Sequence, residues 1–265
     1  MTEIRQLPLW RWSCCVSLAI AVAGAALIAP RHSALAASSA VTPPASICSV
    51  PPELQGTTLP LRHARAQYKA GKTIRIVAFG TSSTAGSGAA NRSDAYPAKL
   101  QEELAHLLPG AKVVVINQGI GGQSSRQMVD HIEDDVVALE PSLVIWQTGT
   151  VDTVNNIDVE EFGNSLSQGI DILHKEDIDV VLMNMQYSRR LELLLNYDPY
   201  DDMMSARAAQ ADVAVFDRLE IMKYWAYSGR FDYDNVPRNE RRQLAAKVHG
   251  CIGRLLAEMI YKGVR

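Results

Sequence analysis

Short apolar runs rich in β-branched residues alternate along this chain with longer segments in which apolar residues recur at helical spacing. The apolar runs, each a candidate strand, lie at residues 74–79, 112–117, 142–147, 179–184 and 213–216. The helical patterns between and after them cover about residues 96–108, 125–139, 159–175, 201–210, 218–227 and 240–261. Strands that alternate with amphipathic helices predict a parallel sheet with helices packed on both faces. The chain is therefore expected to form an α/β fold.

Length and composition are compatible with one main domain of this kind. The chain has 265 residues, of which 47% are hydrophobic and 21% charged, so it can bury a core and does not resemble a disordered protein. We expect the main domain to cover residues 73–265. A proline-containing lead-in with a short helix precedes it at residues 37–72.

The first 36 residues have the pattern of a secretory signal peptide. Arg5 and Arg11 precede an apolar run over about residues 14–29, and Ala-Leu-Ala at residues 34–36 offers a small-residue cleavage site. The pattern predicts export to the periplasm or the medium, with no membrane span left after cleavage. The alternative is an uncleaved membrane anchor, because about 18 apolar residues are just enough to span a bilayer.

The cysteines and the charge follow from this prediction. Cys14 and Cys15 leave with the signal peptide, so Cys48 and Cys251 remain as a pair in a compartment that permits disulfides. We expect them to be bonded, with two separate thiols as the alternative. Removal of residues 1–36 takes away three basic residues and one acidic residue, which changes the formal charge from −3 to −5. Nothing in this balance indicates a nucleic-acid partner.

In a doubly wound sheet, functional groups gather at the carboxyl ends of the strands. The glycine-rich segment after the first candidate strand, G-T-S-S-T-A-G-S-G, lacks the spacing and the lysine of a phosphate-binding loop. The segment after the second strand, G-I-G-G-Q-S, breaks the pattern of a dinucleotide-binding turn. We therefore expect no nucleotide cofactor, and no residue cluster predicts a metal.

These two segments resemble the first two conserved blocks of the SGNH (GDSL-type) serine ester hydrolases. G-T-S-S-T-A-G is similar to block I and places Ser82 at the nucleophile, with Thr81 in place of the aspartate. N-Q-G-I-G-G-Q-S at residues 117–124 is similar to block II and places Gly122 at the glycine whose N–H binds the oxyanion. The resemblance covers roughly Thr73 to the C-terminus and implies a three-layer α/β/α, flavodoxin-like fold with a central parallel sheet of about five strands.

The later blocks depart from the family pattern. In T-G-T-V-D, Val151 stands where the family has the asparagine that donates to the oxyanion, and losing one such donor typically lowers turnover by about 10²–10³-fold. Asp152 follows it, and we expect this residue to serve as a helix N-cap or in a turn.

The final Asp-x-x-His block lacks its histidine. One alignment places Asp234 at the aspartate and Pro237 at the histidine, and the other places Glu240 and Gln243 there. Neither proline nor glutamine can accept the serine proton. Of the other histidines, only His249 lies in the right third of the chain, and we expect it to be a surface or packing residue of the last helix.

Two further segments could shape a ligand site. After the fourth strand, Tyr187, Arg189 and Arg190 could hold an anionic or sugar substrate, with a solvated basic loop as the alternative. Aromatic residues between positions 224 and 233 could stack on glycan rings, although we expect most of them to pack a helix face.

Two functions remain. The first is an exported, weakly active hydrolase of carboxylic esters or O-acetyl groups, in which Ser82 attacks a small ester or an acylated glycan without a cofactor. The alternative is a non-catalytic SGNH-fold protein that binds a glycan or a cell-envelope partner through the same pocket.

Overall fold

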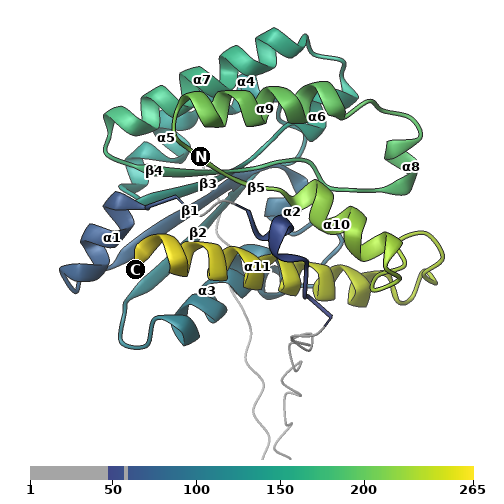
Figure 1. Ribbon diagram of the computed structural model, residues 1–265, viewed down its shortest axis with the longest axis horizontal. Coiled ribbons are helices and arrows are strands. Elements are labelled where there is room, and N and C mark those ends of the chain that lie inside the picture. The colour runs from purple at the N-terminus through teal and green to yellow at the C-terminus, as the bar shows by residue number, and fades with distance from the viewer. Residues whose placement is uncertain (1–46, 57–58) are drawn as a thin grey trace, which may run out of the picture. The chain divides into compact units, whose positions relative to one another are not determined.

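A computed structural model describes residues 47–56 and 59–265 (Figure 1). The predicted signal segment at residues 1–36 lies outside the described residues, and so do residues 37–46 and 57–58 of the predicted lead-in. In the part of the chain that is described, no helix is long and apolar enough to cross a membrane. The signal peptide and its anchor alternative therefore stay predictions.

The fold is built on a parallel sheet of five strands in the order β2-β1-β3-β4-β5. The strands are β1 (Ile74–Gly80), β2 (Val113–Gly119), β3 (Leu143–Gln147), β4 (Asp179–Met183) and β5 (Ala214–Phe216). Every residue of β3 and β4 is buried, which explains why these strands are continuous apolar runs in the sequence. The winding direction reverses between β1 and β3, where ligand sites of such sheets form. The predicted parallel sheet of about five strands is confirmed.

Helices cover both faces of this sheet. They are α1 (Arg62–Lys69), α2 (Ser82–Ala85), α3 (Tyr96–Leu107), α4 (Ser125–Asp130), α5 (Ile132–Asp135), α6 (Thr150–Val154), α7 (Val159–Lys175), α8 (Arg189–Glu192), α9 (Asp198–Gln210), α10 (Arg218–Tyr227) and α11 (Arg241–Val264). In Figure 1, α1, α3 and α11 lie below the sheet, and α4, α5, α7 and α9 lie above it. The three-layer α/β/α architecture is thus confirmed.

One predicted helix differs from the structure. The pattern over residues 125–139 forms α4, α5 and a short 3-10 turn at Val137–Leu139 instead of one helix. A capping box between Ser124 and Gln127 starts α4, but the backbone leaves the helical region at His131 (φ −117°) and Val136 (φ −127°). The pieces still bury an apolar stripe against the sheet, which is why the sequence showed a continuous helical pattern.

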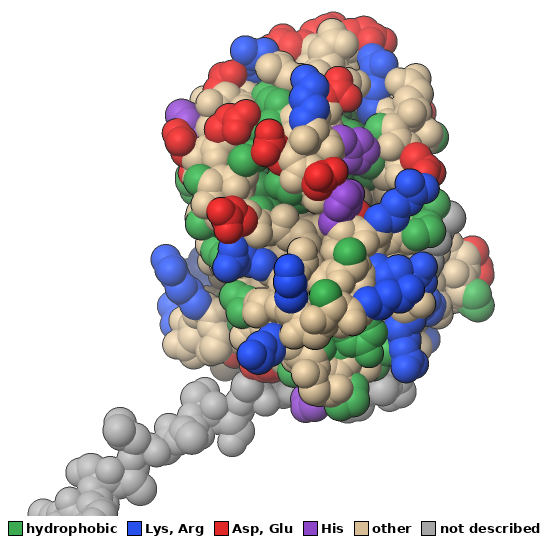
Figure 2. All heavy atoms as spheres, turned by 90° about the vertical axis from the view of Figure 1, so that its left-hand side faces the viewer, with side chains coloured by type: hydrophobic (Ala, Val, Ile, Leu, Met, Phe, Trp, Pro, Cys, Tyr) green, Lys and Arg blue, Asp and Glu red, His purple; other side chains and the backbone are tan. Residues whose placement is uncertain are grey.

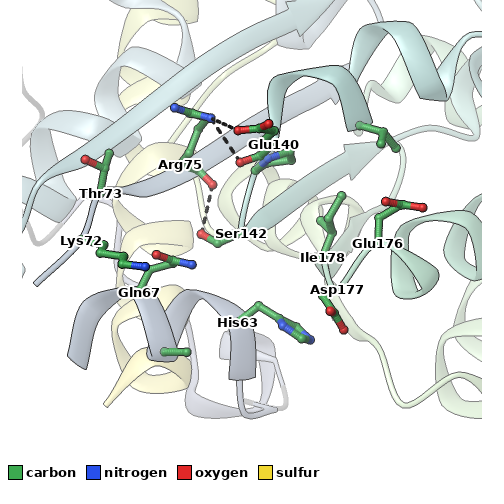
Figure 3. Close-up of a pocket in the computed structure, with 13 residues that line it drawn as sticks. His63, Gln67, Lys72, Thr73, Arg75, Glu140, Ser142, Glu176, Asp177 and Ile178 are labelled. Carbon is green, nitrogen blue, oxygen red and sulfur yellow. Dashed lines mark hydrogen bonds and ion pairs between the residues drawn. The ribbon is translucent and has the colours of Figure 1, made fainter. Parts of the chain in front are cut away.

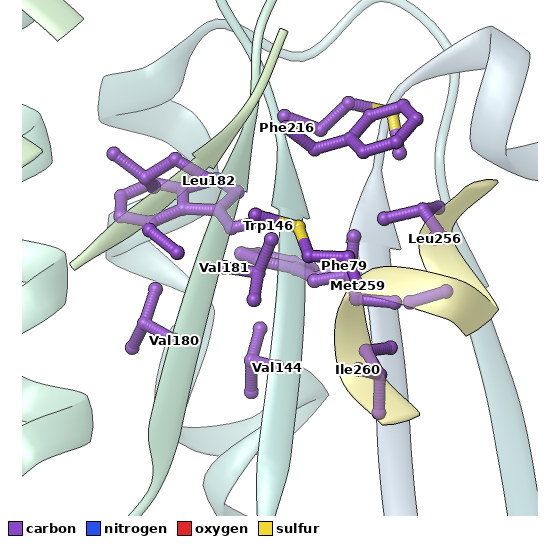
Figure 4. Packing of buried hydrophobic residues seen from close by; sticks show 14 of the residues in the cluster. Phe79, Val144, Trp146, Val180, Val181, Leu182, Phe216, Leu256, Met259 and Ile260 are labelled. Carbon is purple, nitrogen blue, oxygen red and sulfur yellow. The ribbon is translucent and has the colours of Figure 1, made fainter. Parts of the chain in front are cut away.

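The core lies on both sides of the central strands. Trp146 of β3 is fully buried and its ring lies 6.1 Å, centroid to centroid, from that of Phe79 in β1. From the last helix, Leu256, Met259 and Ile260 pack against the sheet (Figure 4). Helix α11 therefore seals one face of the sheet with its C-terminal half.

The segment before β1 is tied to the same helix. Cys48 and Cys251 form a disulfide across a sequence separation of 203 residues. Leu61 is buried, and its N–H donates to the carbonyl oxygen of Gly263 at 3.0 Å. At the start of α1, the backbone N–H groups of residues 63 and 64 donate to the carboxylate of Asp179 at 3.0 and 2.9 Å. These contacts attach the segment before β1 to α11 and to β4, so that it is part of the same core.

We expect removal of the disulfide to lower the stability of the fold, because the cross-link reduces the conformational entropy of a long loop in the unfolded chain. The double variant Cys48→Ser, Cys251→Ser should lose about 2–5 kcal/mol of unfolding free energy. Urea unfolding under oxidising conditions measures this loss. Reducing agent should lower the urea midpoint of the wild type and leave that of the double variant unchanged. Equal midpoints for the two proteins under oxidising conditions would contradict the prediction.

Candidate functional site

The carboxyl edge of the sheet collects the polar residues that could act on a ligand. Ser82 follows β1, the glycine pair Gly121–Gly122 follows β2, Gln147 ends β3, and Arg218 follows β5. This is the edge at which doubly wound sheets bind their ligands.

Ser82 is the first residue of α2, and its side chain is exposed. Its hydroxyl lies against Gly121, where a Cβ atom would come within 2.8 Å of the Ser82 Oγ. The next residue, Gly122, has φ +85°, a conformation that favours glycine. Within the described residues, the N–H groups of Ser82 and Gly122 donate no hydrogen bond. The structure thus brings the predicted nucleophile and the predicted oxyanion glycine loop together.

Gln147 holds the turn that carries Ser82. Its Oε1 atom accepts hydrogen bonds from the backbone N–H of Thr81 at 2.9 Å and from the hydroxyl of Thr81 at 3.1 Å. The hydroxyls of Ser83 and Thr84 donate to the same oxygen, each at 3.1 Å. Gln147 is fully buried, so the end of β3 fixes the serine turn from below.

The sequence predicted that Asp152 serves as a helix N-cap or in a turn. Instead it lies within α6, whose N-cap is Gly149. Its buried carboxylate accepts from the Ser125 hydroxyl at 2.7 Å and from the Ser125 N–H at 3.0 Å. Burial raises the pKa of Asp152, while these hydrogen bonds oppose the shift. Asp152 thus joins α6 to α4, and its neighbour Val151, which is partly exposed, supplies no donor.

His249 is a packing residue, which is one of the two roles that the sequence suggested. It is buried on α11, where its Nδ1 accepts from the Tyr96 N–H at 3.3 Å and its Nε2 lies 3.3 Å from the Ser87 carbonyl oxygen. Its ring stacks on that of Tyr96, and burial lowers its pKa. Within residues 47–56 and 59–265, no side chain hydrogen-bonds to the Ser82 hydroxyl.

The acidic candidates for the last block are both exposed. Asp234 donates its backbone N–H to the carboxylate of Asp232 at 3.0 Å, and Glu240 is the N-cap residue of α11 without a side-chain cap bond. Gln243, which follows on α11, is also exposed. The structure therefore pairs neither acid with an imidazole.

Tyr187 and Arg189, the predicted substrate-binding residues, are absent from the lining of the cavity beside the serine turn. Tyr187 is buried, donates to the Glu192 carboxylate at 3.1 Å, and packs against the rings of Tyr227 and Tyr233. Arg189 is exposed at the start of α8. Neither residue lines the cavity beside the serine turn.

That cavity has a volume of about 250 Å³ and is lined by Ser83, Ser87, Gln186 and residues of α3, α10, α11 and the loop between the last two helices. Arg218, the first residue of α10, lies in its wall with 3% of its surface exposed. Its Nη1 donates to the Ser83 hydroxyl at 2.7 Å. Burial lowers the pKa of this guanidinium to about 10, so it stays charged at neutral pH.

A larger hollow of about 600 Å³ lies at the opposite end of the sheet, where β1, β3 and β4 begin. Figure 3 shows His63, Lys72 and Glu176 around it, and Arg75 in an ion pair with Glu140 at 3.8 Å. Viewed from this end, acidic side chains predominate in the upper half of the molecule and basic ones in the lower half (Figure 2). This amino edge is not where doubly wound sheets bind ligands, and Ser82 is absent from its lining.

A model of the non-GDSL lipase-like family matches residues 47–265. The chain belongs to this family. A comparison with curated proteins finds no match. Thr81 stands where the GDSL sequence has its aspartate.

Solved structures of esterases share the fold. A two-domain esterase, CEX, active on acetylated mannans, has a TM-score of 0.61 at 19% identity over 79% of this chain and 56% of its own. The acetyl xylan esterase AlAXEase has a TM-score of 0.52 at 22% identity over 66% and 97% of the two chains. The SGNH-hydrolase family esterase AlinE4 has a TM-score of 0.50 at 23% identity over 63% and 86%. With the family match, these similarities identify a divergent SGNH-type hydrolase family member.

Three residues of the site were missed in the sequence. Gln147 was included in an apolar run, and only its position at a strand end distinguishes it there. Arg218 follows β5 directly, so inspection of the fifth strand end would have found it. Gly121 was given no role in the site, yet it lies against the Ser82 hydroxyl, whereas Gly122 has the positive φ.

We expect Asp152→Asn to change how stability depends on pH. Because burial raises the pKa of Asp152 in the folded state, its contribution to stability is full below the unfolded pKa of about 3.9 and is lost as pH rises through the folded pKa. The wild type should therefore lose stability relative to the Asn variant between about pH 4 and neutral pH. Urea unfolding of both proteins across this range measures the difference, and a difference independent of pH would contradict the assignment.

Asp152→Ala provides the matched test of the hydrogen bonds. It leaves the Ser125 N–H and hydroxyl without their acceptor, which should cost about 1–3 kcal/mol for each group, whereas Asn retains an acceptor oxygen.

Proposed function

We propose that this chain is an exported serine-dependent esterase of low turnover, acting on a carboxylic ester or an O-acetyl group. The observation that carries the proposal is the position of the Ser82 hydroxyl against the Gly121–Gly122 loop. The unpaired N–H groups of Ser82 and Gly122 are the donors that an oxyanion requires. The esterases of similar fold include one active on acetylated mannans and an acetyl xylan esterase, which favours an acylated glycan as substrate.

The reaction follows from these groups. The Ser82 Oγ bonds to the carbonyl carbon, its proton passes to solvent water, and the carbonyl electron pair becomes an oxyanion held by the two N–H groups. The ester C–O bond then breaks, the departing alcohol takes a proton from water, and a second water molecule hydrolyses the acyl-serine to the acid.

Two differences from the family pattern explain why the proposed esterase has a low turnover. No described side chain takes the Ser82 proton, and loss of the base in a comparable serine hydrolase costs roughly 10⁶-fold, which leaves about 10³–10⁴ over water. Val151 supplies no oxyanion donor, which removes a further factor of about 10²–10³.

Export is the second part of the proposal. The Cys48–Cys251 disulfide is the type of bond that forms in the periplasm or outside the cell. It supports the signal peptide predicted at residues 1–36. Sizing of the chain isolated from the exported fraction would show whether those residues are removed.

The alternative function is a non-catalytic SGNH-fold protein that binds a glycan or a cell-envelope partner. The observation that favours it is the absence of a described side chain hydrogen-bonded to Ser82. The two functions are distinguished by whether covalent chemistry depends on this serine.

We expect Ser82→Ala to abolish hydrolysis of p-nitrophenyl acetate by residues 37–265 and labelling by a fluorophosphonate probe. Ser87→Ala is the matched control, because Ser87 is an exposed serine on the same loop, and it should retain both signals. Equal rates and equal labelling for the wild type and Ser82→Ala would exclude the esterase and leave the binding function.

We also expect Val151→Asn to raise the Ser82-dependent rate by up to about 10²-fold, because an amide donor would be added at the oxyanion. Val154→Asn is the control, since Val154 is an exposed valine of the same helix, 47% exposed. The gain should appear in kcat and should vanish in the double variant with Ser82→Ala. An increase that survives in that double variant would show that the added amide acts elsewhere.

A further inference from the structure

The charges of this chain are divided between its two helix layers. Residues 120–217, which contain α4, α5, α7 and α9, include 19 acidic and 5 basic residues. Residues 47–119 and 218–265, which contain α1, α3 and α11, include 9 acidic and 18 basic residues. Figure 2 shows this division on one face of the molecule. An anionic surface would therefore attract the layer of α1, α3 and α11 and repel the opposite layer.

Basic side chains gather where α1 meets the C-terminal end of α11. Arg62, Arg65 and Lys69 have the spacing that places them on one face of α1. Lys262 and Arg265 lie at the end of α11. The two helices are joined at this point, because the Arg65 Nε donates to a carbonyl oxygen in the last turn of α11 at 3.2 Å. These five cations form the basic corner of the molecule.

Within residues 47–56 and 59–265, none of the five cations of the basic corner belongs to an ion pair. Lys262 donates to the amide oxygen of Gln55 at 3.1 Å, which is an uncharged partner. The Glu258 carboxylate lies close enough to Lys262 to have its pKa lowered by it, although burial raises that pKa more. Asp179 lies beneath the start of α1, where its buried carboxylate accepts from the N–H groups of residues 63 and 64. The basic corner therefore keeps a net positive charge.

We propose that the basic corner docks this protein on a bilayer that contains anionic phospholipids. Clusters of about four to eight Lys and Arg residues bind such bilayers, and each cation near the surface strengthens binding by about fivefold. The cations come from the outer surfaces of two packed helices, so a flat array of headgroups can contact them together. This interaction goes beyond the proposed esterase function and does not depend on hydrolysis at Ser82.

Docking through the basic corner turns the candidate site away from the bilayer. Helix α1 precedes β1, whereas Ser82 follows the other end of this strand. The seven residues of β1 span about 23 Å. In Figure 1, α1 and the C-terminus lie on the left of the molecule and α2 lies to the right of them. Ser82 would then face substrates outside the bilayer, such as an acylated glycan.

The test measures sedimentation of residues 37–265 with vesicles of phosphatidylcholine and phosphatidylglycerol, and with vesicles of phosphatidylcholine alone. These residues contain the whole described fold and leave out the predicted signal segment. Binding should require phosphatidylglycerol and should fall steeply between about 0.1 M and about 0.5 M salt, because salt screens exposed charges. Equal binding to both kinds of vesicle, or binding to neither at low salt, would overturn the proposal.

A triple charge reversal locates the surface. The combination of Arg62→Glu, Lys69→Glu and Lys262→Glu should lower the affinity for phosphatidylglycerol vesicles at least about 100-fold, because three attractive contacts become repulsive. All three side chains are exposed, so the thermal midpoint should stay close to that of the wild type. Unchanged vesicle affinity in this variant would refute the proposal.

The matched control reverses three exposed cations outside the basic corner, Arg190→Glu, Arg238→Glu and Arg242→Glu. It changes the net charge by the same amount, yet it should lower vesicle affinity by less than about fivefold. An equal loss in the two triple variants would show that net charge, and not the basic corner, governs binding.

Soluble polyphosphate distinguishes a bilayer from a polymeric anion. At the same concentration of phosphate it should bind at least tenfold more weakly than the vesicles, because a flexible chain must be ordered before it can meet all five cations. Polyphosphate binding as tight as vesicle binding would assign the basic corner to a polymeric anion and overturn the bilayer.

A fluorophore at either edge of the sheet tests the orientation. Attached to Ala70→Cys, next to the basic corner, it should be quenched by headgroup-labelled lipid more strongly than when attached to Ser87→Cys on the serine loop. Stronger quenching on the serine loop would overturn the orientation. Ser82→Ala should lose hydrolysis and bind vesicles as the wild type does. Failure of hydrolysis in the wild type therefore counts against the esterase alone, and failure of vesicle binding counts against the basic corner alone.

Discussion

The amide oxygen of Gln147 is the interaction on which the candidate site depends. Four donors from the turn after β1 converge on this one atom, although a carbonyl oxygen has only two lone pairs, so the donors share it. Displacing the oxygen would leave several buried donors unsatisfied, at about 1–3 kcal/mol each. The turn with Ser82 therefore has its position set by β3, and through Ser83 the same network reaches Arg218.

This arrangement explains how a serine without a described base can still be held in a defined place. The residues that orient Ser82 are structural ones, Gln147 below it and the glycine pair beside it. Of the positions that differ from the family pattern, Thr81 belongs to that network, whereas Val151 and both candidates for the histidine position, Pro237 and Gln243, take no part in it. Placement of the nucleophile and its activation are thus carried by different parts of the molecule.

Much of the fold could be predicted from the spacing of apolar residues. A parallel strand buried on both faces is a continuous apolar run in the sequence, and the apolar positions of an amphipathic helix repeat about every 3.6 residues. The bounds predicted for α7 and α10 agree with the structure. The break at His131 was not predictable in this way, since the apolar stripe continues through it. The cavity and the burial of Arg218 in its wall were not predictable either, because they depend on side-chain directions that sequence spacing does not encode.

The separation between core and strand tips has a consequence for how such a protein changes over generations. The disulfide and the C-terminal half of α11 hold the fold through contacts that include neither Ser82 nor Val151. Substitutions of these two side chains therefore draw little on folding stability, whose reserve limits most accepted mutations. A lineage with this architecture can let turnover decline and later recover it through a few changes at the strand tips, while the scaffold stays under selection for folding alone.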